Sequence, residues 1–231
     1  MWVEINPTAL PPENAPKIYD IGMKPDEVFE VRLVIFDTVD LAMFDDEGTS
    51  DAFCRAFFDS KIEDHETDTH FRCQDGKASW NYRLNFRISI SDTRKNNYNL
   101  TIQCYDRDFF KSNDIIGETV LNLEQAISDC RLTGRPLGIN KKYYNDYMKD
   151  LPVKFTYKDD NSFYIDLIGM HPEEKKKAVN CKLRCQIDIL PLAAAEANAV
   201  GQARQEPNHS PFLPPPVGRI SFSLNPLKMF Q

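Results

Sequence analysis

The sequence predicts an all-β fold: an eight-stranded antiparallel β-sandwich with a small helical and loop insertion before the last strand. Three observations lead to this prediction. Strand-like segments recur along the chain, and polar segments containing Gly or Asp separate them. Apolar residues alternate in the segment 29–38, which is the period of a strand with one buried face. Hydrophobic residues make up 42% of the 231 residues, which is enough to build a substantial core.

The expected strands follow one another at short intervals. They cover residues 29–38, 51–58, 70–74, 82–90, 99–106, 115–123, 161–170 and 181–190. A short helix is expected at 123–130, and 131–180 is interpreted as an insertion, because a segment of this length could not comfortably bury a core of its own. The domain is therefore assigned to 29–192. Residues 1–28 are interpreted as an N-terminal linker and 193–231 as a Pro-rich linker with a stiff, extended character.

Composition and motifs argue against several functional classes. A net charge of -7 argues against a general nucleic-acid binder, which needs an excess of Lys and Arg. No run approaches the roughly 18 apolar residues of a membrane-spanning helix. The sequence has no GxSxG, P-loop or HExxH motif, so an enzyme is not expected. The six cysteines form no CxxC pair and are expected to be reduced.

Two acidic loops carry the strongest functional signal. FDDEGTSDAF (44–53) supplies Asp45 and Asp51, and YDRDFFKSNDIIGE (105–118) supplies Asp106, Asp108 and Asp114. If the preceding strands end at the same edge of the sandwich, five carboxylates meet there. Two carboxylates about 4 Å apart repel each other by roughly 4 kcal/mol at an effective dielectric constant near 20, so such a cluster requires a cation or shifted pKa values. Ca²⁺ suits the site, because it takes many oxygen ligands in flexible geometry.

The two loops fit an EF-hand or a zinc site less well. The second loop is not an EF-hand, since Lys111 stands where that motif requires glycine. Neither loop contains His or Cys, which counts against Zn²⁺. Asp residues are also good turn formers, and one loop alone would suggest no more than that. Two loops with matched spacing, each following a strong strand, favour the cation site.

Aromatic and basic residues near these loops suggest membrane contact. Phe44, Phe109 and Phe110 flank the aspartates. They either fold under the loops or enter a bilayer once a cation has neutralised the carboxylates, in which case each ring would contribute roughly 1.5–3 kcal/mol. Lys111 stands where it could meet a lipid phosphate. Arg83 and Arg87 share a strand face and form a candidate basic face for phosphoinositide headgroups, although an ordinary solvated face explains them equally well.

The two acidic loops resemble calcium loops one and three of C2 domains. The resemblance rests on Asp45 and the Ser-Asp pair at Asp51, then on the Asp-x-Asp of Asp106 and Asp108, followed by Asp114 and a Gly. The segment GKASWNYRLNF also resembles the Trp-Asn motif near the second calcium loop. Because the closing strand comes last in the chain, the strand order resembles the circularly permuted, type II form of the fold.

The flanking segments resemble those around the last, membrane-proximal C2 domain of ferlins. The region that follows that domain is similar to CKLRCQIDILPLAAAEANAVGQARQEPN, the PPP run and SLNPLKMF. On this resemblance, MWVEI is either the last strand of a preceding C2 domain or an additional strand of this one. This resemblance implies Ca²⁺-dependent binding to anionic phospholipid membranes, in calcium-regulated vesicle trafficking and membrane fusion. It also implies vesicle-fusion proteins as further partners, a place on the cytoplasmic side of a vesicle or the plasma membrane, and a C-terminal transmembrane helix absent here.

A second functional class stays open. In a Ca²⁺-independent protein-interaction or scaffold C2 domain, the same acidic loops would bind a basic protein partner and no lipid. The two hypotheses differ in whether lipid binding depends on Ca²⁺.

Overall fold

Long antiparallel strands dominate the computed structural model, which describes residues 25–43, 48–59, 63–108, 112–170 and 178–219. The strands are β1 (Glu27–Val39), β2 (Ser50–Asp59), β3 (Glu63–Glu66), β4 (His70–Cys73), β5 (Ser79–Ile90), β6 (Asn99–Asp106), β7 (Asp114–Asn122), β8 (Leu137–Gly138), β9 (Thr156–Tyr157), β10 (Phe163–Met170) and β11 (Ala178–Pro191). The helices are α1 (Glu124–Thr133), α2 (Lys141–Tyr143), the π-helical turn η2 (Tyr144–Met148) and α3 (Leu192–Ala197).

The strands form two layers that are joined along one side. Their order is β3-β2-β6-β7-β10-β11-β1-β5, with β4, β8 and β9 paired at the margins. One registered pair, Ile168 with Glu118, joins β10 to β7 and so connects the layer that contains β2 and β6 to the layer that contains β1 and β11. β11 is antiparallel to both β10 and β1. These pairings confirm the predicted antiparallel sandwich and its permuted strand order. The strand β3 was not predicted, because its residues, EDHE, carry no apolar alternation.

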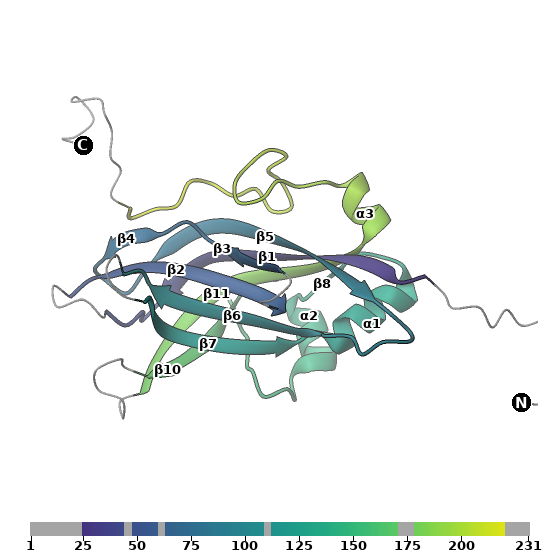
Figure 1. The fold of residues 1–231 in the computed structure, drawn as a ribbon, viewed down its shortest axis with the longest axis horizontal. Helices are drawn as coiled ribbons and strands as arrows, with labels where there is room; N and C mark the ends of the chain where they lie inside the picture. The colour runs from purple at the N-terminus through teal and green to yellow at the C-terminus, as the bar shows by residue number, and fades with distance from the viewer. Residues whose placement is uncertain (1–24, 44–47, 60–62, 109–111, 171–177, 220–231) are drawn as a thin grey trace, which may run out of the picture.

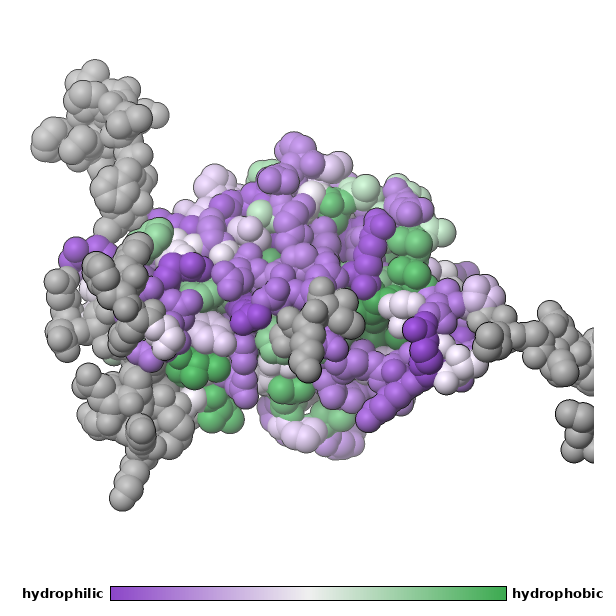
Figure 2. Space-filling view, viewed as in Figure 1, coloured by the Kyte–Doolittle hydropathy of each residue, from purple (hydrophilic) through white to green (hydrophobic). Residues whose placement is uncertain are grey.

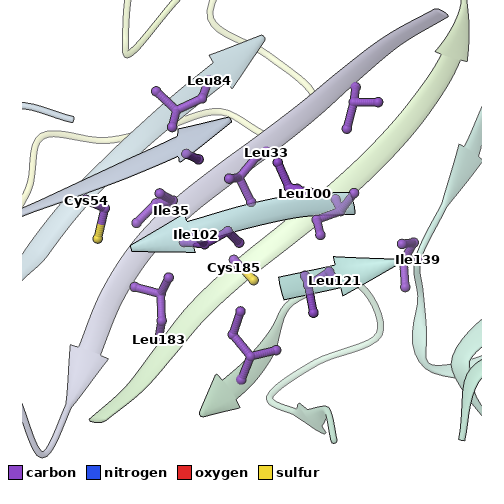
Figure 3. Packing of buried hydrophobic residues seen from close by; sticks show 14 of the residues in the cluster. Leu33, Ile35, Cys54, Leu84, Leu100, Ile102, Leu121, Ile139, Leu183 and Cys185 are labelled. Atoms are coloured by element: carbon purple, nitrogen blue, oxygen red, sulfur yellow. The ribbon is translucent and has the colours of Figure 1, made fainter. Parts of the chain in front are cut away.

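The core lies between the two layers and follows the strand alternation (Figure 3). Leu33 and Ile35 of β1 face Leu100 and Ile102 of β6, and none of these four side chains is exposed to solvent. All six cysteines are free and buried, so they serve as packing residues. Full burial of an aliphatic side chain contributes about 1.5–3 kcal/mol, which makes this contact between layers the main source of stability.

The predicted short helix, observed as α1, and the helix α2 of the insertion lie at the end of the sandwich away from the acidic loops (Figure 1). Arg131 in the last turn of α1 donates to Glu27 at 2.6 Å and to Asp92 at 2.9 Å. Glu27 begins β1 and Asp92 follows β5, so both mark that far end. The helices therefore leave the acidic strand ends uncovered, and the last strand of the insertion, β10, joins the sheet.

After α3, the chain runs back along the outer side of β5 as a C-terminal strap, residues 198–219 (Figure 1). Arg83 of β5 holds the strap. Its buried guanidinium donates to the carbonyls of Gly201 at 3.1 Å, His209 at 2.8 Å and Pro211 at 2.6 Å. A buried cation is costly unless hydrogen-bond acceptors surround it, and the strap supplies those acceptors. The residues expected to form part of a linker thus pack against the sandwich.

Candidate functional site

Three of the predicted ligand aspartates lie at neighbouring strand ends. Asp51 is the second residue of β2, Asp106 ends β6 and Asp114 begins β7. The register pairs Ala52 with Asp106, and Asp106 with Asp114. Because adjacent antiparallel strands place one strand's start beside the next strand's end, sequence segments far apart converge here. Figure 1 shows these strand ends at the left of the sandwich.

Asp106 is a nearly buried carboxylate at the mouth of the core. In β6 the core-facing positions run through Leu100, Ile102 and Cys104, and Asp106 continues that row, with 3% of its surface exposed. Its Oδ1 accepts a 2.6 Å hydrogen bond from the backbone N–H of Asp51. Its Oδ2 accepts a 3.0 Å hydrogen bond from the hydroxyl of Ser50. These donors orient the carboxylate.

Asp51 is held from two sides. Its Oδ1 accepts from the backbone N–H of Arg72 in β4 at 2.7 Å, and its backbone carbonyl accepts from the N–H of Arg107 at 2.9 Å. The guanidinium of Arg107 lies 4.0 Å from the ring centre of Phe53 and donates to Thr69 Oγ1 at 2.9 Å. Sequence reasoning did not assign roles to Ser50 and Arg72. The Ser-Asp pair was a usable signal for Ser50, whereas a backbone donor such as Arg72 N–H leaves no trace in the sequence.

The other predicted ligands lie in the loops. Asp108 follows β6, and its backbone N–H donates to Asn113 Oδ1 at 3.0 Å. Asp45 lies outside the described residues, and so do the predicted membrane contacts Phe44, Phe109, Phe110 and Lys111. Among the described residues, no three His, Cys, Asp or Glu side chains lie close enough together to hold a metal ion. The donors at this end are carboxylate and hydroxyl oxygens, which is the chemistry that Ca²⁺ prefers.

Exposed apolar side chains flank the acidic strand ends. Phe71 in β4 is 45% exposed, and Ile115, which follows Asp114 in β7, is 37% exposed. Figure 2 shows hydrophobic surface at this end of the molecule, at the lower left of the view. Large apolar groups at a protein surface that also carries charge often mark an interaction site. Neither residue was predicted as a contact, because each sits in a strand whose pattern did not reveal which face is buried.

The two arginines of the candidate basic face have different surroundings. Arg83 is covered by the C-terminal strap, and its guanidinium donates hydrogen bonds to backbone carbonyls of the strap. Arg87 lies farther along the same face of β5, has a side chain that is 62% exposed and stands 3.9 Å from Glu30. The pair therefore does not form one exposed basic surface, because the strap covers one member.

Comparisons with known proteins show that the chain is similar to C2 domains and to ferlins. A family model described as the C2 domain matches residues 29–135. The chain is 28% identical to Ferlin 2 of Tetrahymena thermophila over 197 residues, which cover 81% of this chain and 10% of that protein. It is 23% identical to myoferlin of Mus musculus over 247 residues, which cover 94% of this chain and 12% of that protein. The chain carries a ferlin-like C2 domain.

The ferlin-like chain thus spans about a tenth of the length of the curated relatives that it matches. Among solved structures, a C2 domain of plant Extended Synaptotagmin 1 aligns with a TM-score of 0.42 and 18% identity, over 73% of this chain and 97% of that domain. Human GIVD cytosolic phospholipase A2 aligns with a TM-score of 0.43 and 13% identity, over 74% of this chain and 18% of that enzyme. Within the described residues, no helix has the length and apolar character needed to cross a membrane.

Proposed function

We propose that this ferlin-like C2 domain binds Ca²⁺ at its acidic end and, with Ca²⁺ bound, docks on membranes that contain anionic phospholipid. One observation carries the proposal: Asp51, Asp106 and Asp114 come from three segments of the chain and stand at adjacent strand ends. Carboxylate oxygens are the ligands that Ca²⁺ prefers, and the loop residues would have to complete the set, since no three acidic, His or Cys side chains of the described residues lie close enough to hold an ion.

The chain's own residues would prepare the site before a cation arrives. Asp106 is already oriented by Ser50 and by the N–H of Asp51, so little side-chain freedom would be lost on binding. Asp51 is oriented by the N–H of Arg72. Asp108 and the predicted ligand Asp45 would complete the oxygen set from the two loops. When bound, Ca²⁺ supplies the positive charge that allows this end to approach an anionic surface.

The apolar residues would supply the membrane contact. Phe71 and Ile115 are exposed beside the aspartates, and the predicted contacts Phe44, Phe109 and Phe110 belong to the same two loops. Transfer of a ring into a bilayer contributes roughly 1.5–3 kcal/mol, but only if the neighbouring carboxylates do not repel the lipid phosphates. Ca²⁺ and lipid are therefore expected to bind cooperatively. Lys111 would add a contact to phosphate.

The relatives suggest a setting for this activity. We infer a membrane-associated protein on the cytoplasmic side of vesicles or the plasma membrane, which acts in calcium-regulated trafficking and fusion with vesicle-fusion proteins as further partners. A binding module rather than an enzyme is proposed, since the carboxylate and hydroxyl oxygens of the acidic end suit a cation. A membrane anchor beyond this segment stays part of the proposal.

Calorimetric titration of the chain with Ca²⁺, with and without liposomes that contain phosphatidylserine, tests the proposal. Weak binding that tightens with lipid is expected in the natural chain, and loss of both effects is expected in a double variant with Asp106→Asn and Asp108→Asn. The matched control is Asp160→Asn, which removes an exposed carboxylate from the insertion at the far end. Equal heats of Ca²⁺ binding in the double variant and the control would show that Asp106 and Asp108 are not ligands.

The scaffold alternative predicts a different result in the same experiment. A chain that binds no Ca²⁺ in either condition, and whose co-sedimentation with liposomes does not change with Ca²⁺, would use its acidic loops for a basic protein partner. The charge of -7 and the exposed carboxylates would then act through steering of that partner.

A further inference from the structure

The C-terminal strap is tied to the acidic end through one carboxylate, Asp68. Asp68 lies in the short connection between β3 and β4. Arg204 of the strap donates to its Oδ2 at 2.6 Å, and Arg219, at the end of the described strap, donates to its Oδ1 at 2.9 Å. Burial alone would raise the pKa of Asp68, but hydrogen bonds from Arg219 and Arg204 outweigh it and hold the pKa below its ordinary value. Asp68 is therefore charged and doubly paired.

The same two arginines also bind the sandwich backbone. Arg204 donates to the carbonyl of Trp80 at 2.7 Å, and Arg219 donates to the carbonyl of Ser79 at 2.8 and 2.6 Å. Each guanidinium thus joins the β3–β4 connection to the start of β5. The planar fork of arginine suits this double role, because its donors point in fixed directions. We call the contact of Asp68, Arg204 and Arg219 the strap clasp.

From the strap clasp, two short routes lead to Asp51. Thr69, next to Asp68, accepts through Oγ1 a hydrogen bond from Arg107 Nε at 2.9 Å, and the backbone N–H of Arg107 donates to the carbonyl of Asp51. Four residues after Asp68, the N–H of Arg72 donates to Oδ1 of Asp51 at 2.7 Å. The segment held by the clasp therefore donates directly to the carboxylate of Asp51 through the N–H of Arg72. It also supplies, in Thr69 Oγ1, the acceptor that holds Arg107, whose N–H donates to the backbone carbonyl of Asp51.

We propose that the C-terminal strap is a positioning element of the acidic site and that Asp68 is the residue through which it acts. With the clasp closed, the 67–72 segment is fixed and Asp51 is held in place. With the clasp open, that segment gains freedom, and ordering it again costs part of the binding free energy of a cation. Because coupling between two sites is reciprocal, a cation bound at the acidic end would also tighten the strap.

The inference rests in part on the proposed Ca²⁺ binding, and its test separates the two. Hydrogen exchange of backbone amides, measured by NMR on the full chain without any cation, reports the coupling directly. In Asp68→Asn, the amides of Arg72 and Arg107 are expected to exchange about tenfold faster, which corresponds to about 1.4 kcal/mol of local opening free energy. In Asp68→Glu, which keeps the charge, much of the protection should return. Arg219→Gln opens the clasp from the strap side and should give the same pattern.

A purely structural role makes a different prediction. If the clasp only holds the strap down, Asp68→Asn will speed exchange at the strap amides of Gly201 and Ala203 and leave Arg72 and Arg107 unchanged, and the proposal is then wrong. If both pairs respond, Ca²⁺ titration follows, and binding in Asp68→Asn is expected to weaken by about fivefold, at the low end of measured couplings. If the natural chain binds no Ca²⁺, the proposed function is wrong. The exchange data would still decide whether the strap positions Asp51.

Discussion

The guanidinium of Arg83 in β5 donates a 2.6 Å hydrogen bond to the carbonyl of Pro211 in the C-terminal strap. This contact joins residues that lie 128 positions apart. It shows that the segment after the last strand belongs to the packed structure, because carbonyls of that segment accept hydrogen bonds from a buried cation. A domain boundary drawn at the end of β11 would therefore cut through an interface.

Replacement of Arg83 tests this interface. Arg83→Met should lower the free energy of unfolding by about 3 kcal/mol, since it removes charge-assisted hydrogen bonds and leaves three carbonyls without their donor. Urea denaturation gives the free energy, and limited proteolysis should show earlier cleavage in the strap. Arg87→Met is the matched control on the same strand face and should change stability by less than about 0.5 kcal/mol, because its side chain is exposed. Equal losses in the two variants would contradict the role assigned to Arg83.

Gly169 marks the point where β10 meets β7. A Cβ atom at this position would overlap the backbone oxygen of Ile116, a clash that only movement of a strand could relieve. Gly169→Ala is therefore expected to destabilise the fold by about 2–3 kcal/mol and to loosen the join between the two layers. Thermal unfolding measures the effect. The neighbouring exposed position provides the control, since Ile168→Ala should cost much less. An unchanged midpoint in Gly169→Ala would show that the strands separate more easily than their backbone contact indicates.

His70 predicts a loss of stability in mild acid. Its ring is buried, and Nδ1 accepts from the N–H of Ser79 at 2.9 Å, so the ring is neutral when folded. Burial lowers the pKa of His70, the nearby charge of Arg219 lowers it further, and the Gly218 carbonyl, Asp75 and Asp68 oppose the shift only in part. Below about pH 6.5, His70 therefore binds a proton in the unfolded chain but stays neutral in the folded chain until the pH is lower.

The free energy of unfolding should consequently decrease as the pH falls from about 7 to about 5, and His70 should contribute no pH dependence above about pH 7. In His70→Asn, whose side-chain oxygen can replace Nδ1 as an acceptor, this part of the pH dependence should disappear. Urea denaturation at a series of pH values measures both curves. Parallel curves for the two proteins would assign the acid sensitivity to carboxylates instead.

The buried thiols predict slow chemical modification. Burial raises the pKa of Cys130 to about 11, and burial also raises the pKa of Cys185. Both groups are therefore protonated at neutral pH, and a protonated thiol is a poor nucleophile. A thiol reagent should modify the native protein only as fast as local opening exposes each group, and should modify all six cysteines rapidly in denaturant. A fast stoichiometric phase in the native protein would reveal an accessible thiol.

The adjacency of the acidic residues was within reach of sequence reasoning. Strand-like segments identified β2, β6 and β7, and the expectation that strands 29–38 and 99–105 end at one edge brought the aspartates together. The structure places Asp51, Asp106 and Asp114 at adjacent ends through the pairing of β2 with β6 and of β6 with β7. The same reasoning paired Arg83 with Arg87 as one basic face, because strand alternation says which side chains share a face and nothing about what covers that face. The strand β3 was missed because its residues show no apolar alternation, and only its pairing with β2 makes it a strand.

By itself, the sequence determined the strand periodicity, the permuted order that ends on β11 and the carboxylates available at the loop end, because these depend on local alternation and on spacing along the chain. Only the tertiary structure decided that residues 198–219 fold back over β5 and that Asp68 is paired with two arginines of the strap. It also decided that a backbone N–H of β4 holds Asp51. These contacts join residues far apart in the chain, and hydrogen bonds to backbone groups can be made by any residue type. The physical reason is that these contacts depend on which segments the folded chain brings together and buries, and neither local alternation nor composition specifies that.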